Sequence, residues 1–244
     1  MTETSVALVT GSSSGIGAAI AARLAAAGTR VVVNSARSVR TGKEVADALP
    51  DAVYVQADIS DEDQARGLVE AAIRHYGRLD VLVNNAGTTR MIPHKDLDAA
   101  TPDVWREILG TNVLGTWQVT VAAVPHLRAS GAGSIVNISS IAGSRPAGSS
   151  IPYAVSKAAI EHMTRLLAGA LGPEIRVNAV APGLVDTLWT AGEAFTKIRQ
   201  QVEAITPLRR VGTRDDVAEA VLALIGCSYT TGQVLMTDGG AHLR

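Results

Sequence analysis

The chain has 244 residues, of which 47% are hydrophobic and 18% are charged, and its formal net charge is -1 at pH 7. This length and apolar content predict one large core, and so a single domain over residues 1–244. The 22 basic residues are scattered along the chain, which argues against nucleic acid or a membrane surface as a partner. No apolar run reaches the roughly 20 residues that span a bilayer, and no secretory leader opens the sequence. We therefore expect a cytoplasmic protein.

The metal-ligating residue types give no metal-binding pattern. The five histidines lack ligand spacing, and the acidic groups Asp61–Asp63 and Asp215–Asp216 open predicted helices, where they complement the helix dipole. The single cysteine, Cys227, has no basic neighbours in sequence and is expected to be a small buried hydrophobe. The sequence therefore predicts no metal site and no disulfide.

Short β-branched runs alternate along the chain with Ala- and Leu-rich segments of helical length. We predict strands at Val6–Val9, Arg30–Val33, Val53–Gln56, Leu79–Asn84, Ser134–Ile138, Arg176–Val180 and Gln233–Met236. Helices are predicted near 16–27, 41–49, 61–76, 101–128, 151–171 and 213–225. Several strands are apolar throughout, as when helices cover both faces of a parallel sheet. The pattern predicts an α/β protein with a Rossmann-type doubly wound parallel sheet of about seven strands.

Two segments depart from this alternation. The helical stretch 101–128 is unusually long, and Pro125 near its end is expected to bend or end it. The stretch 188–211 has no β-branched run and contains Gly192 and Pro207, which favours a short helical lid over the substrate.

A glycine-rich loop follows the first strand. In Thr10–Gly17 the glycines at 11, 15 and 17 allow a tight turn and a close approach of the backbone to a pyrophosphate. The helix that follows offers its unpaired N–H groups and its dipole to the anion. The spacing is Gly-x-x-x-Gly-x-Gly, and no Gly-Lys-Ser/Thr follows, so a dinucleotide is favoured over a P-loop nucleotide.

The chemistry-bearing residues lie in the second half of the chain. Ser139 and Ser140 end the fifth strand, at the edge where parallel sheets bind ligands. Ser149 or Ser150 can cap the next helix, on which Tyr153 and Lys157 are four residues apart and share one face. An ammonium beside a phenol is expected to lower the phenol's pKa from its usual value of about 10, although such a spacing alone also describes an ordinary surface pair.

Taken together, these motifs resemble the short-chain dehydrogenase/reductase family, over nearly the whole chain. The resemblance rests on the Thr10–Gly17 loop, Asp58, Asn84–Gly87, Asn112, Ser140 thirteen residues before Tyr153, Lys157, and Pro182-Gly183. It implies that Tyr153 is the acid/base and that Lys157 lowers its pKa and holds the nicotinamide ribose. It further implies that Ser140 binds the substrate oxygen, with Ser139 as the competing serine, and that Asn112 supports a water-linked proton relay to Lys157.

The resemblance also implies a nicotinamide dinucleotide and the residues that contact it. The expected contacts are Gly11, Ser13, Ser14, Gly15, Ile16, Gly17, Asn34, Ser35, Arg37, Ser38, Asp58, Ile59, Asn85, Ala86, Gly87, Tyr153, Lys157, Pro182, Gly183, Val185 and Thr187. An acidic residue that hydrogen-bonds the adenosine ribose is expected near the end of the second strand, but Ser35 occupies that position. Without that carboxylate, Arg37 can bind a 2′-phosphate, with Asn34, Ser35 and Ser38 as hydrogen-bond partners. The sequence therefore predicts NADP(H), although Arg37 as a solvated loop charge remains the alternative.

The substrate is expected to be a small ketone or aldehyde reduced to an alcohol. Its walls are predicted at Thr88–Lys95, around Ser144–Ile151 and in the lid, with Met91, Ile92, Leu188, Trp189 and Phe195 as apolar candidates. Within the family the chain looks most like 3-oxoacyl-carrier-protein reductases, yet basic residues expected to dock a carrier protein are missing, although Arg128 is close by. Two alternatives stay open: a 3-oxoacyl-carrier-protein reductase of fatty acid synthesis, and a catalytically idle dinucleotide-binding scaffold or sensor. The family resemblance also implies a homotetramer.

Overall fold

The computed structural model describes residues 4–187 and 193–243, and for residues 193–195 the backbone alone. Seven parallel strands form one sheet in the order β3-β2-β1-β4-β5-β6-β7. The strands are β1 Val6–Val9, β2 Arg30–Ser35, β3 Ala52–Gln56, β4 Val81–Asn84, β5 Gly133–Ile138, β6 Ile175–Pro182 and β7 Val234–Thr237. This is the predicted doubly wound α/β fold, and each predicted strand lies within two residues of an observed one.

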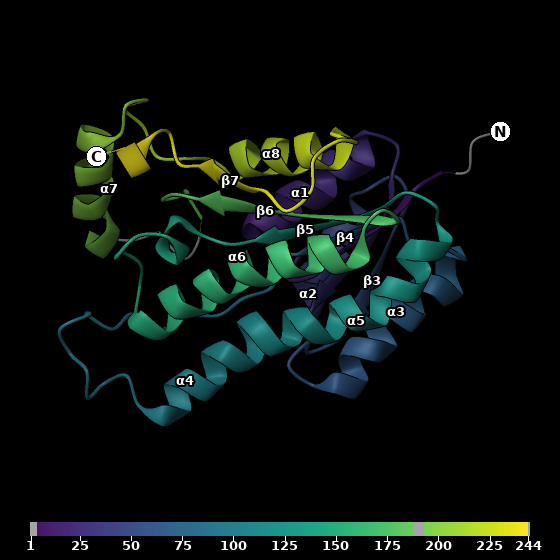
Figure 1. Cartoon of the computed structure of the whole chain (residues 1–244), viewed down its shortest axis with the longest axis horizontal. Coiled ribbons are helices and arrows are strands. Elements are labelled where there is room, and N and C mark those ends of the chain that lie inside the picture. The colour runs from purple at the N-terminus through teal and green to yellow at the C-terminus, as the bar shows by residue number, and fades with distance from the viewer. Residues whose placement is uncertain (1–3, 188–192, 244) are drawn as a thin grey trace.

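Helices cover both faces of the sheet, as Figure 1 shows for α3, α5 and α6 on one face and α1 and α8 on the other. The helices are α1 Gly15–Ala26, α2 Val39–Asp47, α3 Glu62–Tyr76, α4 Pro102–Leu109, α5 Thr116–Ala129, α6 Ile151–Leu171, α7 Glu193–Ile205 and α8 Arg214–Gly226. Alternate residues of the central strands enter different cores: Val6 and Leu8 pack with α3, α5 and α6, whereas Ala7 and Val9 pack with α1, α2 and α8. The apolar strand runs therefore follow from burial on both faces.

The predicted single helix over 101–128 is three elements. Between α4 and α5 lies a π-helical turn, Gly110–Gly115, where a Cβ on Gly115 would lie 2.8 Å from Ile59 Cγ1. The glycine at this position permits a close approach to the chain after β3. Pro125 does not end the helix, which continues to Ala129, because the fully buried Leu127 packs the last turn against the core. The predicted end at Pro125 was wrong, and the π-helical turn at Gly110–Gly115 was not predicted.

Several further expectations can be compared with the structure. Asp61 caps α3, and Thr213 with Asp216 forms a capping box on α8, in keeping with a structural role for these acids. The described residues contain no cluster of three or more metal-ligating side chains. Cys227 is exposed, contrary to prediction, and it is the C-cap residue of α8, at the end of that helix. Among the helices that the structure describes, none is long and apolar enough to cross a membrane.

Candidate functional site

A cleft of about 1050 Å³ lies where the carboxyl ends of the strands meet, across the point where β1 is flanked by β2 and β4. It is lined by Ser140 and by every residue that the sequence analysis assigned to the cofactor. Among the predicted catalytic and cofactor-binding residues, Asn112 alone does not line the cleft. Residues from seven separate loops are thus brought to one cavity.

The glycine-rich loop forms one end of the cleft. Gly11 and Gly15 have φ of +63° and +58°, values that L side chains rarely adopt. A Cβ on Gly17 would lie 2.5 Å from Asn85 Nδ2 and 2.6 Å from the oxygen of Gly11, so this position requires glycine. Ser14 is the N-cap residue of α1 but makes no side-chain capping bond, which leaves the first N–H groups of the helix available to an anion.

Asn85 and Thr10 hold the glycine-rich loop against the segment after β4. Asn85 Nδ2 donates to the main-chain oxygens of Thr10 and Gly11, at 2.9 and 3.0 Å. The hydroxyl oxygen of Thr10 accepts from the main-chain N–H groups of Asn85 and Ala86, both at 3.0 Å. The shape of the loop is therefore built in by direct hydrogen bonds.

The structure revises the prediction for Asn34. Its side-chain oxygen accepts from Gly11 N at 3.2 Å, and its Nδ2 donates to the oxygens of Val55 and Ala57, at 3.2 and 3.1 Å. The residue is 1% exposed. Both N–H bonds of the amide are thus used within the protein, so Asn34 braces the glycine-rich loop and is not available to hydrogen-bond a 2′-phosphate.

The other residues at the end of β2 differ in how they face the cleft. Ser35 is buried, and its hydroxyl bonds the hydroxyl of Tyr54 at 2.9 Å, while Tyr54 also donates to the main-chain oxygen of Ser35 at 3.3 Å. Either hydroxyl can donate in the bond between Ser35 and Tyr54, so Ser35 shares its hydrogen-bonding capacity with Tyr54. Arg37 and Ser38 are exposed and line the cleft, so they remain as candidate donors.

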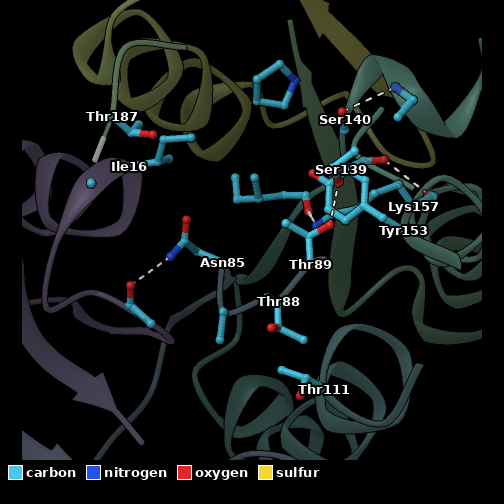
Figure 2. Close-up of a pocket in the computed structure, with 18 of the residues that line it drawn as sticks. Ile16, Asn85, Thr88, Thr89, Thr111, Ser139, Ser140, Tyr153, Lys157 and Thr187 are labelled. Atoms are coloured by element: carbon cyan, nitrogen blue, oxygen red, sulfur yellow. Dashed lines mark hydrogen bonds between the residues drawn. The ribbon is translucent and has the colours of Figure 1, made fainter. Parts of the chain in front are cut away.

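Ser140, Tyr153 and Lys157 converge on one wall, shown in Figure 2 opposite Ile16 and Thr187. Ser150 caps α6 by accepting from the main-chain N–H of Tyr153 at 3.3 Å, which decides between the two predicted caps. Tyr153 is hydrogen-bonded to Ser140, and Lys157 Nζ lies 5.6 Å from the centre of the Tyr153 ring. Lys157 Nζ donates to the main-chain oxygen of Ile138 at 2.8 Å. The predicted trio is therefore assembled, with the hydroxyls of Ser140 and Tyr153 adjacent.

Burial changes the acidity of this trio in a direction that the sequence analysis did not predict. It raises the pKa of Tyr153, an effect opposed by the hydrogen bond with Ser140, and it lowers the pKa of Lys157 to about 8. The expected lowering of the Tyr153 pKa is absent in the protein alone, because removal from water outweighs the hydrogen bond with Ser140. In this state the Tyr153 phenol keeps its proton.

Ser139, the competing serine, has a different role. It is buried, and its hydroxyl donates to the main-chain oxygen of Lys157 at 3.1 Å and to Glu161 Oε1 at 3.2 Å. Burial raises the pKa of Glu161, while the bond from Ser139 and the charge of Arg165 oppose that shift. Ser139 therefore lines the cleft and joins β5 to α6.

Asn112 lies in the π-helical turn and is 1% exposed. Its Nδ2 donates to the oxygen of Thr88 at 3.0 Å and to Ser156 Oγ at 2.9 Å, and its Oδ1 accepts from Thr88 N at 2.7 Å. Its main-chain oxygen accepts from the hydroxyl of Thr116 at 2.8 Å. The side chain predicted to support a relay thus fixes the loop after β4 and has no remaining donor for water.

The substrate half of the cleft is formed by loops and by α7. Met91 lines it as predicted, whereas Ile92 does not; Leu188, Trp189 and the Phe195 side chain lie outside the described residues. The apolar side chains from α7 that line it are Ile198, Val202 and Ile205. Their i, i+4, i+7 spacing was a signal in the sequence that could have identified this face.

Arg145 and Ala241 line the cleft, but sequence analysis did not single out either residue. Arg145 fell only within the range around Ser144–Ile151 that was predicted as a substrate wall. Arg145 Nη1 donates to the main-chain oxygen of Ala241 at 2.7 Å, across a separation of 96 residues. No local pattern predicts such a contact, since it depends on where β7 ends relative to β5.

Comparison with known proteins agrees with this geometry. A family model described as enoyl-(acyl carrier protein) reductase matches residues 11–242. A proposed ketoacyl reductase 2 of the granaticin polyketide synthase from Streptomyces violaceoruber is 68% identical over 242 residues, covering 99% of this chain and 97% of that protein. The 3-oxoacyl-[acyl-carrier-protein] reductase of Thermotoga maritima is 38% identical over 248 residues, covering 98% of each.

Solved structures give the same result. A proposed short-chain dehydrogenase/reductase from Burkholderia xenovorans superposes with a TM-score of 0.91 at 36% identity and covers 100% of both chains. The matches span the sheet, the glycine-rich loop and the Ser140–Tyr153–Lys157 wall alike. The chain therefore belongs to the short-chain dehydrogenase/reductase family and is an oxidoreductase of the kind that acts on CH–OH or ketone groups.

Proposed function

We propose that this protein is an NADPH-dependent reductase that converts a ketone or aldehyde to an alcohol, with Tyr153 as the proton donor. The observation that carries the proposal is the convergence of the Ser140 hydroxyl, the Tyr153 phenol and the Lys157 ammonium in the same cleft as an uncapped helix N-terminus. A scaffold or sensor that only bound a dinucleotide would need the helix end but not these three groups.

The glycine-rich end of the cleft fits a dinucleotide. The close approach at Gly17, the positive φ of Gly11 and Gly15, and the available N–H groups of α1 form a cradle for a pyrophosphate. When bound, a nicotinamide dinucleotide supplies the hydride. The loops that carry Asn85–Gly87 and Val185–Thr187 line the remaining length of the cleft between this cradle and Tyr153.

The residues of the wall act on the substrate oxygen. As hydride transfer to a carbonyl develops negative charge on oxygen, the Ser140 hydroxyl donates a hydrogen bond to it and Tyr153 transfers its proton. The raised pKa of Tyr153 keeps that proton available at neutral pH, and the Lys157 ammonium favours the phenolate that remains. Asn112 would act as a positioning residue by fixing Thr88 on the substrate side.

The end of β2 supports a preference for NADP(H) over NAD(H). No carboxylate occupies position 35, so nothing there repels a 2′-phosphate or accepts both ribose hydroxyls. Arg37 offers a guanidinium at the exposed edge of the cleft, and Ser38 adds a hydroxyl. A charge-assisted bond of about 1.5–3 kcal/mol would give the phosphorylated cofactor a preference of more than tenfold.

The second candidate function is reduction of a 3-oxoacyl group. It is favoured by the 68% identity to a proposed ketoacyl reductase of a polyketide synthase. Docking of an acidic carrier protein is disfavoured, because several arginines around the cleft are already paired with carboxylates. The pairs are Arg90 with Glu107, Arg106 with Asp103, Arg199 with Asp186 and Arg210 with Asp216. A 3-oxo substrate presented without a carrier is consistent with both observations.

We further propose that the protein is a cytoplasmic homotetramer. Support comes from exposed apolar side chains on α5 and α6, which include Trp117, Val121, Val155 and Leu166. Together with Leu114 in the π-helical turn, Trp117 and Val121 form a stripe at i, i+3, i+7 spacing, an arrangement suited to burial against a second copy.

The test is a kinetic screen of ketones and aldehydes, including 3-oxoacyl thioesters with and without a carrier protein, against NADPH and NADH. We expect NADPH oxidation with at least one ketone, and a loss of 10²-fold or more in kcat for Tyr153→Phe with little change in the Kd for NADPH. Tyr229→Phe, at a fully exposed tyrosine remote from the cleft, is the matched control. Binding of NADPH without turnover of any carbonyl would instead favour the scaffold.

A further inference from the structure

The C-terminal turn, Asp238–Leu243, follows β7 and is organised by a buried acid. The Asp238 side chain is 1% exposed. Its carboxylate accepts from the main-chain N–H groups of Gly240 at 2.9 Å and His242 at 2.7 Å, and both of its oxygens lie 3.0 Å from His242 Nδ1. Since Asp238 collects these bonds from its own turn, the carboxylate fixes the conformation of the last described residues.

This turn packs against the segment that leaves α7. Gly239 and Gly240 have φ of +64° and +85°, and Cβ atoms on them would lie 2.7 Å from Thr206 Cγ2 and 2.8 Å from Pro207 Cγ. Leu208 N donates to the oxygen of Gly239 at 3.2 Å. Figure 1 shows the short yellow turn that follows β7 beside α7 at one end of the molecule. The apolar wall that α7 contributes to the cleft is therefore anchored at its C-terminal end by this turn.

Two further contacts connect the turn to the cleft. A Cβ on Gly183 would lie 2.8 Å from Asp238 Cβ, so the acid backs the loop after β6. On the other side, Arg145 Nη1 donates to the oxygen of Ala241 at 2.7 Å. Arg145 lies in the loop that joins Ser140 to Tyr153, and both Arg145 and Ala241 line the cleft. One turn thus contacts the loop after α7, the loop after β6 and the loop between the two predicted catalytic hydroxyls.

We propose that Arg145 and Asp238 are positioning residues that hold the C-terminal turn as a fixed wall of the substrate half of the cleft. Through this wall they set the affinity and the size limit for the carbonyl substrate, and they take no part in hydride or proton transfer. The proposal rests on the proposed function, because its kinetic readout is carbonyl reduction. It concerns the substrate end of the cleft, so substitution of Arg145 is predicted to leave the Kd for NADPH unchanged, whereas Asp238 also backs Gly183, a predicted cofactor contact.

The first test compares Arg145→Met with Arg145→Lys. Loss of the guanidinium donor is expected to raise KM for the carbonyl substrate about tenfold, with kcat changed by less than about twofold and the Kd for NADPH unchanged. Lysine keeps a donor and is expected to restore part of the affinity. Bulky ketones that the wild type rejects should become substrates of Arg145→Met. Arg74→Met, at an exposed arginine on α3 paired with Glu70, is the matched control.

The second test separates an effect through the turn from direct contact between Arg145 and substrate. If both residues act through the turn, the double variant Arg145→Met/Asp238→Asn raises KM no more than the worse single variant. Additive effects on KM, an unchanged KM, or an equal loss of NADPH affinity in Arg145→Met would overturn the proposal. Asp215→Asn, at an exposed aspartate, is the control for the change of charge.

A third measurement does not depend on turnover. Hydrogen exchange of peptides from residues 141–149 and 239–243 is expected to accelerate together in Arg145→Met and to stay unchanged in Arg74→Met. If the wild type turns over no carbonyl, the proposed function fails while this measurement still tests the wall. Acceleration confined to residues 141–149 would overturn the connection to the C-terminal turn.

Discussion

Lys157 Nζ donates a 2.8 Å hydrogen bond to the main-chain oxygen of Ile138, the last residue of β5. The side chain is 6% exposed, and burial lowers its pKa from 10.5 to about 8. An ammonium is thus held at the cleft wall by a neutral carbonyl, in a place where its charge is costly. Such a group affects stability as well as chemistry, and the two effects can be measured separately.

The stability effect has a definite sign. In the unfolded chain Lys157 keeps its proton up to a pH near 10.5, whereas the folded protein releases it above about 8. Between these values the unfolded state binds more protons, so this group makes the free energy of unfolding rise with pH. From pH 7 to pH 10, the unfolding free energy of wild type is expected to rise by roughly 2 kcal/mol relative to that of Lys157→Met.

Urea unfolding at several pH values, without cofactor, measures this difference. Lys43→Met, at an exposed lysine in α2, is the control for the loss of a lysine side chain. If the difference in unfolding free energy between wild type and Lys157→Met does not change with pH, the ammonium is not destabilised by burial.

The two neighbouring serines provide a second prediction. Ser140→Ala removes a donor from the reacting oxygen and is expected to lower kcat by 10²-fold or more, with a small effect on stability. Ser139→Ala removes the donor to Glu161 and is expected to cost about 1–3 kcal/mol of stability with a much smaller loss of kcat. Steady-state kinetics and urea unfolding of both variants check this. If Ser139→Ala loses kcat and Ser140→Ala loses stability instead, Ser139 is the serine that contacts the reacting oxygen.

The cofactor preference gives a third prediction. Arg37→Ala is expected to weaken NADPH binding by about tenfold or more and to leave NADH binding nearly unchanged, because only the 2′-phosphate is lost as a partner. Arg40→Ala, which removes an exposed arginine paired with Glu44 one turn further on, is the control. Fluorescence titration of both cofactors measures the effect, and equal losses for both would refute a phosphate contact.

A substitution that adds a carboxylate at Ser35 tests the same preference for NADPH over NADH. Ser35→Asp places a carboxylate where the ribose hydroxyls of NAD(H) are expected, and it can accept the Tyr54 hydroxyl in place of Ser35. We expect the ratio of NADPH to NADH affinity to fall, through both repulsion of the phosphate and a gain for NADH. An unchanged ratio would mean that the loop after β2 does not select the cofactor.

The apolar stripe on α5 yields a prediction about assembly. Trp117 is 47% exposed in the single chain, and Trp117→Arg would bury a charge if that face meets a second copy. We expect wild type to be a tetramer and Trp117→Arg to form smaller species in light scattering at micromolar concentration. Leu97→Arg, at an exposed leucine outside the helices, should leave the assembly intact. A monomeric wild type would contradict the expectation.

Local sequence determined the alternation of elements, since strands buried on both faces are apolar throughout and helices such as α3, α6 and α8 begin with capping side chains. It also determined the glycine positions, because a positive φ at Gly11 or a close approach at Gly17 excludes other residues. The four-residue spacing of Tyr153 and Lys157 on one helix made them a pair before any tertiary contact was known. These features depend on residues near one another in the chain.

Tertiary structure decided the roles of residues whose partners are distant. Asn34 and Asn112 are amides that could face a ligand, and the fold instead uses them to brace the chain after β3 and β4. The direction of the Tyr153 pKa shift was mispredicted because it depends on how much water the folded wall excludes, which sequence spacing does not report. The bond from Arg145 to Ala241 exists because parallel strands β5, β6 and β7 end at one edge, which brings residues 96 apart into contact.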